Sequence, residues 1–236
     1  YFNMDHLHID IETYSSVDIS SAGAYKYVES LYFEILMMSY AFNDEPVHII
    51  DFAQGEKMPK RVSEALLNKN VLKIAHNASF ERTCFKAIGI DIPVEQWMCT
   101  AIKSAYCGLP LSLDGVSKAL KLGEAAKDSI GKALIRYFSV PVKPTKINGG
   151  RVRNLCYHDP EKWQAFKNYC IQDVVAEREI EKRLKKYEIP AQERDLYCLD
   201  QKINDRGILI DLQMASNAYD INEKFSEELT EELKSL

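Results

Sequence analysis

One short segment near the start of the chain, LHIDIETYS at residues 7–15, constrains the fold more than any other. Its leucine and two isoleucines alternate with polar residues, and a period of two predicts a β-strand with one buried face. Asp10 and Glu12 then project from the same side of that strand, about 7 Å apart. Because like charges repel at this spacing, the pair indicates either a strand face open to water or a cation held between two carboxylates.

Length and composition place the chain among globular proteins. Its 236 residues are 46% hydrophobic and 28% charged, which is enough to bury a full core in one large domain or in a domain with an appendage. No apolar run approaches the ~18 residues of a membrane span. The six cysteines lack the CxxC pairs that are typical of zinc sites. We therefore expect a cytoplasmic protein with reduced thiols and no membrane segment.

The charge of the chain is unevenly distributed. A formal net charge of −5 would disfavour binding to nucleic acid, yet residues 129–158 contain six cations and no acidic side chain. Such a one-sided segment indicates either a surface that follows a phosphate backbone or a solvated loop of chance composition. The six cations are Lys132, Arg136, Lys143, Lys146, Arg151 and Arg153.

Apolar patterns and turn residues predict an alternation of strands and helices. Five strands are expected, the first over residues 7–12 and the last over 96–100. The longest helix is expected to begin with Asp159 as its N-cap and Pro160 at its first helical position. Residues 139–154, rich in Pro, Gly and Asn, predict a loop. The other expected strands lie at 34–42, 46–52 and 71–77, and the other helices at 60–69, 78–89, 101–107, between Ser112 and Gly123, after Pro190, and over 211–236.

Two further motifs carry acidic groups. Tyr169 and Asp173 stand four residues apart on the long helix, so their side chains share one face. Glu81 lies in the first turn of the helix that follows strand 71–77. Taken singly, each motif has an ordinary explanation, because such pairs are common on helix surfaces and acids favour helix N-termini.

The order of these motifs resembles a known enzyme family. DxE on the first strand, NxxxE after a later strand and YxxxD on the late helix resemble the DEDD superfamily of 3′→5′ exonucleases, tyrosine subclass. The resemblance is closest to the proofreading domain of family A DNA polymerases and covers roughly residues 5–188. INDRGILID, at 203–211, resembles the element that opens the polymerase portion in this family. The histidine subclass has a histidine five residues before the last aspartate, where this chain has Asn168.

The resemblance implies a fold and a domain organisation. The expected fold is α/β, a ribonuclease H-like mixed five-stranded sheet flanked by helices, with a C-terminal helical extension. An exonuclease domain is expected over residues 1–190 and the start of a polymerase domain over 191–236, in a chain that continues beyond Leu236. Two positions depart from the family pattern, since Glu81 replaces an aspartate and Cys99 replaces an acid that is not one of the four ligands.

The resemblance also implies a site for two divalent cations, Mg²⁺ or Mn²⁺. Asp10 would bridge both ions, and Glu12 and Asp173 would complete the site beside the attacking water. Glu81 would hold the other ion through water, because its extra methylene moves the carboxylate by about 1.5 Å. Tyr169 would orient the attacking water with its hydroxyl, and an unperturbed phenol with a pKa near ~10 is a poor proton acceptor.

The substrate implied by the resemblance is the 3′ end of single-stranded DNA. Thr13 would donate hydrogen bonds to that end, while Asn77 and Phe80 would lie near the terminal nucleotides. The basic segment would follow the backbone through Lys143, Lys146, Arg151 and Arg153. The expected partner is the remainder of a polymerase polypeptide, with the chain a monomer in a bacterial or phage-infected cell.

Two alternatives stay open from the sequence. A ribonuclease D-like enzyme that trims RNA shares the same four acids and tyrosine, although it would have no need of RGILID. A catalytically idle nucleic-acid-binding domain is the second alternative, although every ligand position retains an acid. His76 and His158 are expected to have no ligand role.

Overall fold

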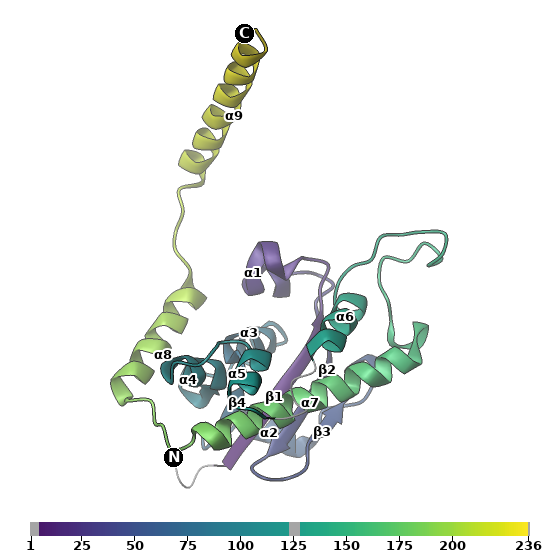
Figure 1. Ribbon diagram of the computed structural model, residues 1–236, viewed down its shortest axis with the longest axis vertical. Helices are drawn as coiled ribbons and strands as arrows, with labels where there is room; N and C mark the ends of the chain where they lie inside the picture. The colour runs from purple at the N-terminus through teal and green to yellow at the C-terminus, as the bar shows by residue number, and fades with distance from the viewer. Residues whose placement is uncertain (1–4, 123–127, 236) are drawn as a thin grey trace. The chain divides into compact units, whose positions relative to one another are not determined.

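The computed structural model describes residues 5–122 and 128–235 (Figure 1). The chain forms two compact units, Tyr1–Arg194 and Asp195–Leu236. The six cysteines are free thiols. Among the described helices, none combines the length and the apolar character that crossing a membrane requires.

The first unit is built on a mixed sheet of five strands in the order β3-β2-β1-β4-β5. Strand β2 runs antiparallel to β1 and β3, whereas β4 runs parallel to both β1 and β5. The predicted mixed five-stranded sheet flanked by helices is therefore confirmed. The strands are β1 Asp5–Tyr14, β2 Glu34–Phe42, β3 His48–Ile50, β4 Val71–Ala75 and β5 Trp97–Cys99.

The central strand β1 corrects one expectation from the sequence. Alternation predicted one buried face, but the polar side is also covered, and His8 is only 4% exposed and Glu12 8%. Helix α7 (Pro160–Leu184) packs against β1 and β2 and covers this side, as Figure 1 shows. A hydrogen bond of 2.7 Å between His8 Nδ1 and Glu177 Oε2 joins the strand to the helix.

The remaining helices of the first unit surround the sheet. The Asp159 side chain caps α7 as predicted, accepting a hydrogen bond from the Lys162 amide, and Ser112 caps α5 in the same way. The expected stop of α5 at Gly123 lies outside the described residues. These helices are α1 Ile19–Val28, α2 Lys60–Leu67, α3 Ala78–Ala87, α4 Thr100–Tyr106, α5 Leu113–Ala119 and α6 Asp128–Phe138, with short 3-10 turns at Phe52–Gln54, Val94–Gln96 and Cys156–His158.

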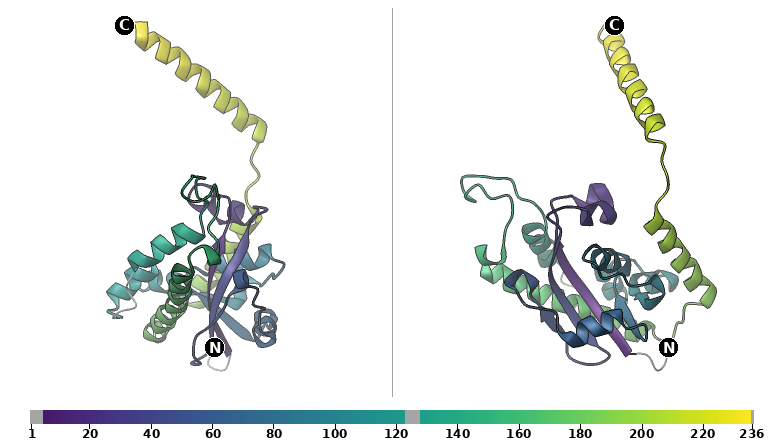
Figure 2. Two further views of the ribbon diagram at one scale, coloured as in Figure 1. Left: turned by 90° about the vertical axis from the view of Figure 1, so that its right-hand side faces the viewer. Right: turned by 180° about the vertical axis from the view of Figure 1, so that it is seen from behind.

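Two of these helices, α1 and α6, were not predicted. Gly23 interrupts α1 with φ +76°, so the segment lacks a continuous helical pattern. Helix α6 overlaps the basic segment, and only two apolar residues at helical spacing, Leu134 and Phe138, are buried in its second half. Their spacing of four residues places them on one face, which packs against α7. Figure 2 shows the backbones of the two helices side by side.

The second unit is helical. The division between the two units falls between Arg194 and Asp195, within helix α8 (Ala191–Arg206), whereas the domain boundary predicted from the sequence is at 190/191, where this helix begins. Gly207 ends the helix with φ +72°. Helix α9 (Leu212–Ser235) forms the predicted C-terminal helical extension.

Candidate metal centre

Strand β1 and helix α7 bring together three carboxylates that are distant in the sequence. One side-chain oxygen from each of Asp10, Glu12 and Asp173 lies within 4.8 Å of the other two. Glu12 is buried, whereas Asp10 and Asp173 are partly exposed, so the cluster has access to solvent. Three hard oxygen donors at this separation can hold a divalent cation such as Mg²⁺ or Mn²⁺.

The periodicities of the two elements create this arrangement. Side chains two residues apart share one side of β1, which places His8, Asp10 and Glu12 opposite α7. On α7, four-residue spacing aligns Asp173 with Glu177. The hydrogen bond between His8 and Glu177 joins the residues that neighbour Asp10 on β1 and Asp173 on α7, and it therefore fixes the position of the helix along the strand.

Burial and mutual repulsion shape the protonation of the cluster. Burial raises the pKa of Asp10 well above its ordinary value, and the charge of Asp173 raises it further. Burial also raises the pKa of Glu12, with added contributions from Asp10 and Asp173. Without a cation these acids therefore favour bound protons, and a divalent ion would relieve both the desolvation and the repulsion.

Glu81, the predicted fourth ligand, lies in the first turn of α3. It is only 3% exposed, and its Oε2 has no hydrogen-bond partner among the described residues. Burial raises the pKa of this carboxyl, and the charge of Asp10 raises it further. Glu81 thus interacts electrostatically with Asp10, although it is not one of the three acids that lie within 4.8 Å of one another.

Tyr169 lies one helical turn before Asp173. Its ring stacks on Phe166 at a centroid distance of 6.4 Å and an interplanar angle of 11°. Its pKa is raised by burial, then by the charge of Asp173 and of Glu12, and also by a hydrogen bond to Asp173. The phenol therefore stays protonated and can act as a hydrogen-bond donor.

Helix α1 supplies the neighbours of two predicted substrate contacts. Thr13 is buried, and a hydrogen bond of 2.9 Å joins its Oγ1 to the hydroxyl of Tyr27. Phe80 is partly exposed, with its ring 6.1 Å from that of Tyr27. Asn77 is exposed and begins α3 with φ +75°, a conformation that asparagine tolerates better than most residues.

The predicted loop at 139–154 is ordered by the side chain of Asn148. Its Oδ1 accepts hydrogen bonds from the backbone amides of Thr145 and Gly150, at 2.9 and 3.1 Å. Its Nδ2 donates to the carbonyl oxygens of Lys143 and Arg151, at 2.9 and 3.2 Å. The loop exposes Lys143 and Lys146, whereas Arg151 is partly buried.

Arg153 differs from the other cations of this loop. Its guanidinium forms an ion pair with Glu34 and lies over the ring of Tyr14, 3.7 Å from the ring centroid. Arg153 therefore already has an anionic partner, and its contacts attach the end of the loop to the start of β2 and the end of β1.

Cys170, which was not predicted as a site residue, also contacts the cluster. This buried thiol donates to Asp10 Oδ2 at 3.3 Å. Burial raises the pKa of Cys170 well above its ordinary value, and the thiol therefore keeps its proton. The available signal was its position beside Tyr169, on the side of α7 that faces the sheet.

The two histidines expected to lack a ligand role have other partners. His76 Nδ1 lies 3.0 Å from Thr100 Oγ1, and its Nε2 lies 2.8 Å from the carbonyl oxygen of Leu111. His158 Nδ1 accepts a hydrogen bond of 2.8 Å from the Leu155 amide.

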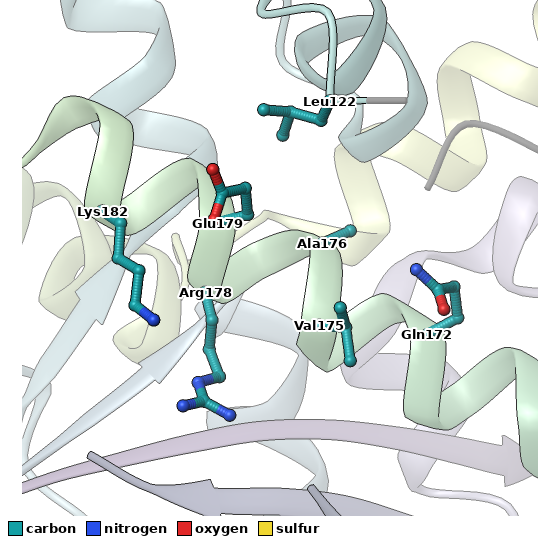
Figure 3. A pocket seen from close by; sticks show the side chains of 7 residues that line it. All are labelled: Leu122, Gln172, Val175, Ala176, Arg178, Glu179 and Lys182. Carbon is teal, nitrogen blue, oxygen red and sulfur yellow. The ribbon is translucent and has the colours of Figure 1, made fainter. Parts of the chain in front are cut away.

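A separate pocket of about 290 Å³ lies along α7 (Figure 3). Gln172, Arg178 and Lys182 are among the side chains that line it. None of the clustered acids contributes to its lining, so this pocket is not the candidate metal centre.

The mixed sheet, the clustered carboxylates and Tyr169, which lies on the same helix as Asp173, define a nuclease of the DEDD type. The chain belongs to the 3′-5′ exonuclease domains of family A DNA polymerases, because the family model described as 3′-5′ exonuclease matches residues 10–187. A DNA polymerase of Bacillus phage SP02 is 54% identical over 234 residues, which cover 99% of this chain. The chain spans 36% of the length of that relative.

Solved structures of several nucleases are similar over most of the chain. One, described as the apo form of the nuclease, is 15% identical, with a TM-score of 0.45 and coverage of 83% of this chain and 80% of that one. Ribonuclease D of Escherichia coli, an exoribonuclease, is 17% identical, with a TM-score of 0.41 and coverage of 84% and 45%.

Proposed function

We propose that this 3′-5′ exonuclease hydrolyses the terminal phosphodiester of single-stranded DNA with two divalent cations, Mg²⁺ or Mn²⁺. The observation that carries the proposal is the approach of Asp10, Glu12 and Asp173 to within 4.8 Å of one another. Cations held there would lower the pKa of the attacking water and stabilise the charge on the leaving 3′ oxygen.

The protein's own groups have distinct roles in this proposal. Asp10 would bridge both ions, as the family resemblance implies. The charges of Asp10 and of Glu12 both interact with Asp173 and with Glu81, so the four acids form one electrostatic group. Glu12 and Asp173 would complete the site next to the attacking water. The Tyr169 hydroxyl, which donates its proton to Asp173, would accept a hydrogen bond from that water and so orient it.

Glu81 would hold the second cation through water. Its support is the buried Oε2 without a hydrogen-bond partner among the described residues, since an isolated buried carboxylate is costly. A hydrated cation between Glu81 and Asp10 would satisfy that oxygen and offset the charge that raises its pKa.

The substrate strand would enter along groups that lie outside the cluster. Phe80 would stack on a terminal base, a contact worth about 1–3 kcal/mol. Asn77 would contact the same end, as would Thr13, whose hydroxyl Tyr27 orients. Lys143, Lys146 and Arg151 would follow the phosphates, and Arg153 would contribute mainly by anchoring the loop through Glu34.

We further propose that residues 1–190 form a proofreading domain and that residues 191–236 begin a polymerase domain. The support is the relative from phage SP02, which is a DNA polymerase and extends beyond the region matched by this chain. We propose a monomer in the cytoplasm of a bacterial or phage-infected cell, a setting that suits six free thiols.

The test measures removal of nucleotides from a 5′-labelled single-stranded DNA oligonucleotide in Mg²⁺ and in EDTA. Asp10→Ala should abolish hydrolysis, whereas Tyr169→Phe should slow it less because the metal ligands remain. Glu188→Gln, an exposed carboxylate just beyond α7, is the control and should cleave normally. Near-native turnover by Asp10→Ala would contradict the assignment of the site.

The same assay addresses the remaining alternatives. An RNA oligonucleotide of the same sequence should be hydrolysed more slowly than the DNA, and the reverse order would favour a ribonuclease D-like activity. Titration with Mn²⁺, followed by electron paramagnetic resonance, should show binding that Asp10→Ala weakens. Absence of Mn²⁺ binding by the unchanged chain would favour an idle nucleic-acid-binding domain.

A further inference from the structure

Gly131 of α6 lies directly against the ring of Tyr169. A Cβ atom placed on Gly131 would lie 2.6 Å from both Cδ2 and Cζ of that ring, and closer still to Cε2. Carbon atoms in favourable contact are separated by about 3.5–4.0 Å. The backbone of α6 therefore touches the tyrosine ring, and glycine is the only residue that fits here without displacing it.

The conformation of Gly131 gives no other reason for a glycine. The residue is buried within α6, whereas glycines such as Gly55 and Gly207 end helical segments with positive φ angles. In a regular helix alanine is more favourable than glycine, because glycine loses more conformational entropy on folding. The close approach of the Tyr169 ring is thus the feature that requires a glycine at this position.

The ring of Tyr169 has little freedom to give way. Phe166 stacks on it, and Phe138 of α6 stacks on Phe166 in turn, with centroids 5.5 Å apart and an interplanar angle of 15°. Asp173 forms a hydrogen bond with the hydroxyl at the other end of the side chain. A methyl group on Gly131 would therefore shift the ring, the hydroxyl or α6 itself.

We propose that Gly131 is a positioning residue for Tyr169, so that α6 forms a wall of the active site. Contact between the α6 backbone and the ring would set where the hydroxyl points relative to Asp10, Glu12 and Asp173. This inference rests on the proposed role of Tyr169 in orienting the attacking water. Small displacements matter for such a role, since about 1 Å of misplacement can cost roughly 100-fold in rate.

The experiment is a double-mutant cycle in the 236-residue chain. Four proteins are compared: the unchanged chain, Gly131→Ala, Tyr169→Ala and the double variant. The measurements are kcat and KM on a single-stranded DNA oligonucleotide in Mg²⁺, and the melting temperature in EDTA. Ala133→Ser is the matched control, because it also adds one heavy atom to α6 but at an exposed position.

A positioning role predicts a specific pattern of coupling. Gly131→Ala should lower kcat by at least tenfold with KM within twofold, and Ala133→Ser should leave both unchanged. In the Tyr169→Ala background the same glycine substitution should change kcat by less than twofold, because the clash is gone. There it should also raise the melting temperature, since only the better helix propensity of alanine remains.

Three results would overturn the proposal, and they are distinguishable from one another. If Tyr169→Ala loses activity but Gly131→Ala keeps kcat within twofold, or loses equally in both backgrounds, Gly131 does not act through the tyrosine. If Tyr169→Ala retains full activity, the proposed role of Tyr169 is wrong. The positioning role of Gly131 then fails as well, whatever the melting temperatures of the four proteins are.

Discussion

Replacing Asp173 with Asn should stabilise the metal-free protein while removing its exonuclease activity. Asp173 lies within 4.8 Å of both Asp10 and Glu12, measured between side-chain oxygens. At an effective dielectric constant of ~20, two unit charges at that separation repel by about 3.5 kcal/mol. Asparagine keeps the size of the side chain and an acceptor oxygen for Tyr169, but it removes the charge.

The expected gain is smaller than the full repulsion, because the acids already respond by holding protons. Burial and neighbouring charge raise the pKa of Asp10 and of Glu12, so protonation relieves part of the repulsion. We therefore expect the free energy of unfolding to rise by about 1–3 kcal/mol. For a chain of this length each kcal/mol corresponds to roughly 2–4 °C in melting temperature.

The pH dependence has a definite sign. Acids whose pKa is raised by folding contribute stability that is complete below their unfolded pKa, near ~4, and that is lost as the pH rises through the folded pKa. In EDTA, the melting temperature of the unchanged chain should therefore fall between pH 5 and pH 8. Asp173→Asn should fall less, because the pKa shifts of Asp10 and Glu12 are smaller without its charge.

Differential scanning fluorimetry in EDTA measures the change in stability and its pH dependence, and the same measurement in excess Mg²⁺ tests metal binding. Mg²⁺ should raise the melting temperature of the unchanged chain more than that of the variant, because a ligand stabilises only the state that binds it. Glu188→Gln is the control and should behave like the unchanged chain. An Asp173→Asn protein that melts no higher in EDTA, and gains equally from Mg²⁺, would refute the reasoning.

Three further predictions concern groups around the site. Cys170→Ala removes the thiol donor to Asp10 and should weaken Mn²⁺ binding in a titration, whereas Cys170→Ser should restore much of the affinity. Equal Mn²⁺ affinities of the unchanged chain and Cys170→Ala would exclude a role for the donor. Asn148→Ala should raise KM for a long oligonucleotide but not for a dinucleotide, because the loop that carries Lys143 and Lys146 loses its hydrogen bonds. A fall in kcat on both substrates would contradict this prediction. Asp51→Ala should lower the free energy of unfolding by about 3–5 kcal/mol in urea titrations. It removes a buried carboxylate that pairs with Lys167 Nζ at 3.2 Å and accepts from Trp163 Nε1 at 2.8 Å, and a loss below about 1 kcal/mol would show that the site relaxes.

The sequence predicted the strands and the long helix because their patterns are local. Alternation over β1 and the cap at Asp159 depend only on neighbouring residues, and both are present in the structure. The order of the acidic motifs likewise pointed to one site, and the structure brings Asp10, Glu12 and Asp173 together. The roles of Glu81 and of the predicted substrate contacts remain proposals.

What the sequence did not predict depends on contacts between distant segments. His8 and Glu12, on the polar side of β1, are buried because α7 packs against this strand, and the local sequence pattern does not predict that contact. Gly131 and Cys170 have no motif, since their importance follows from the Tyr169 ring and the Asp10 carboxylate that lie against them. The sequence predicted that Arg153 follows the substrate backbone, and its ion pair with Glu34 joins residues that are 119 positions apart in the chain.

The division of the cluster between β1 and α7 has a consequence for biosynthesis. Ribosomes synthesise a chain from its N-terminus, so Asp10 and Glu12 emerge long before Asp173 does. Nascent fragments that end before α7 therefore lack one of the three clustered acids. Exonuclease activity would arise only after nearly the whole first unit has been translated and has folded. Ordering of this kind would protect a cell's nucleic acids from unfinished polypeptides.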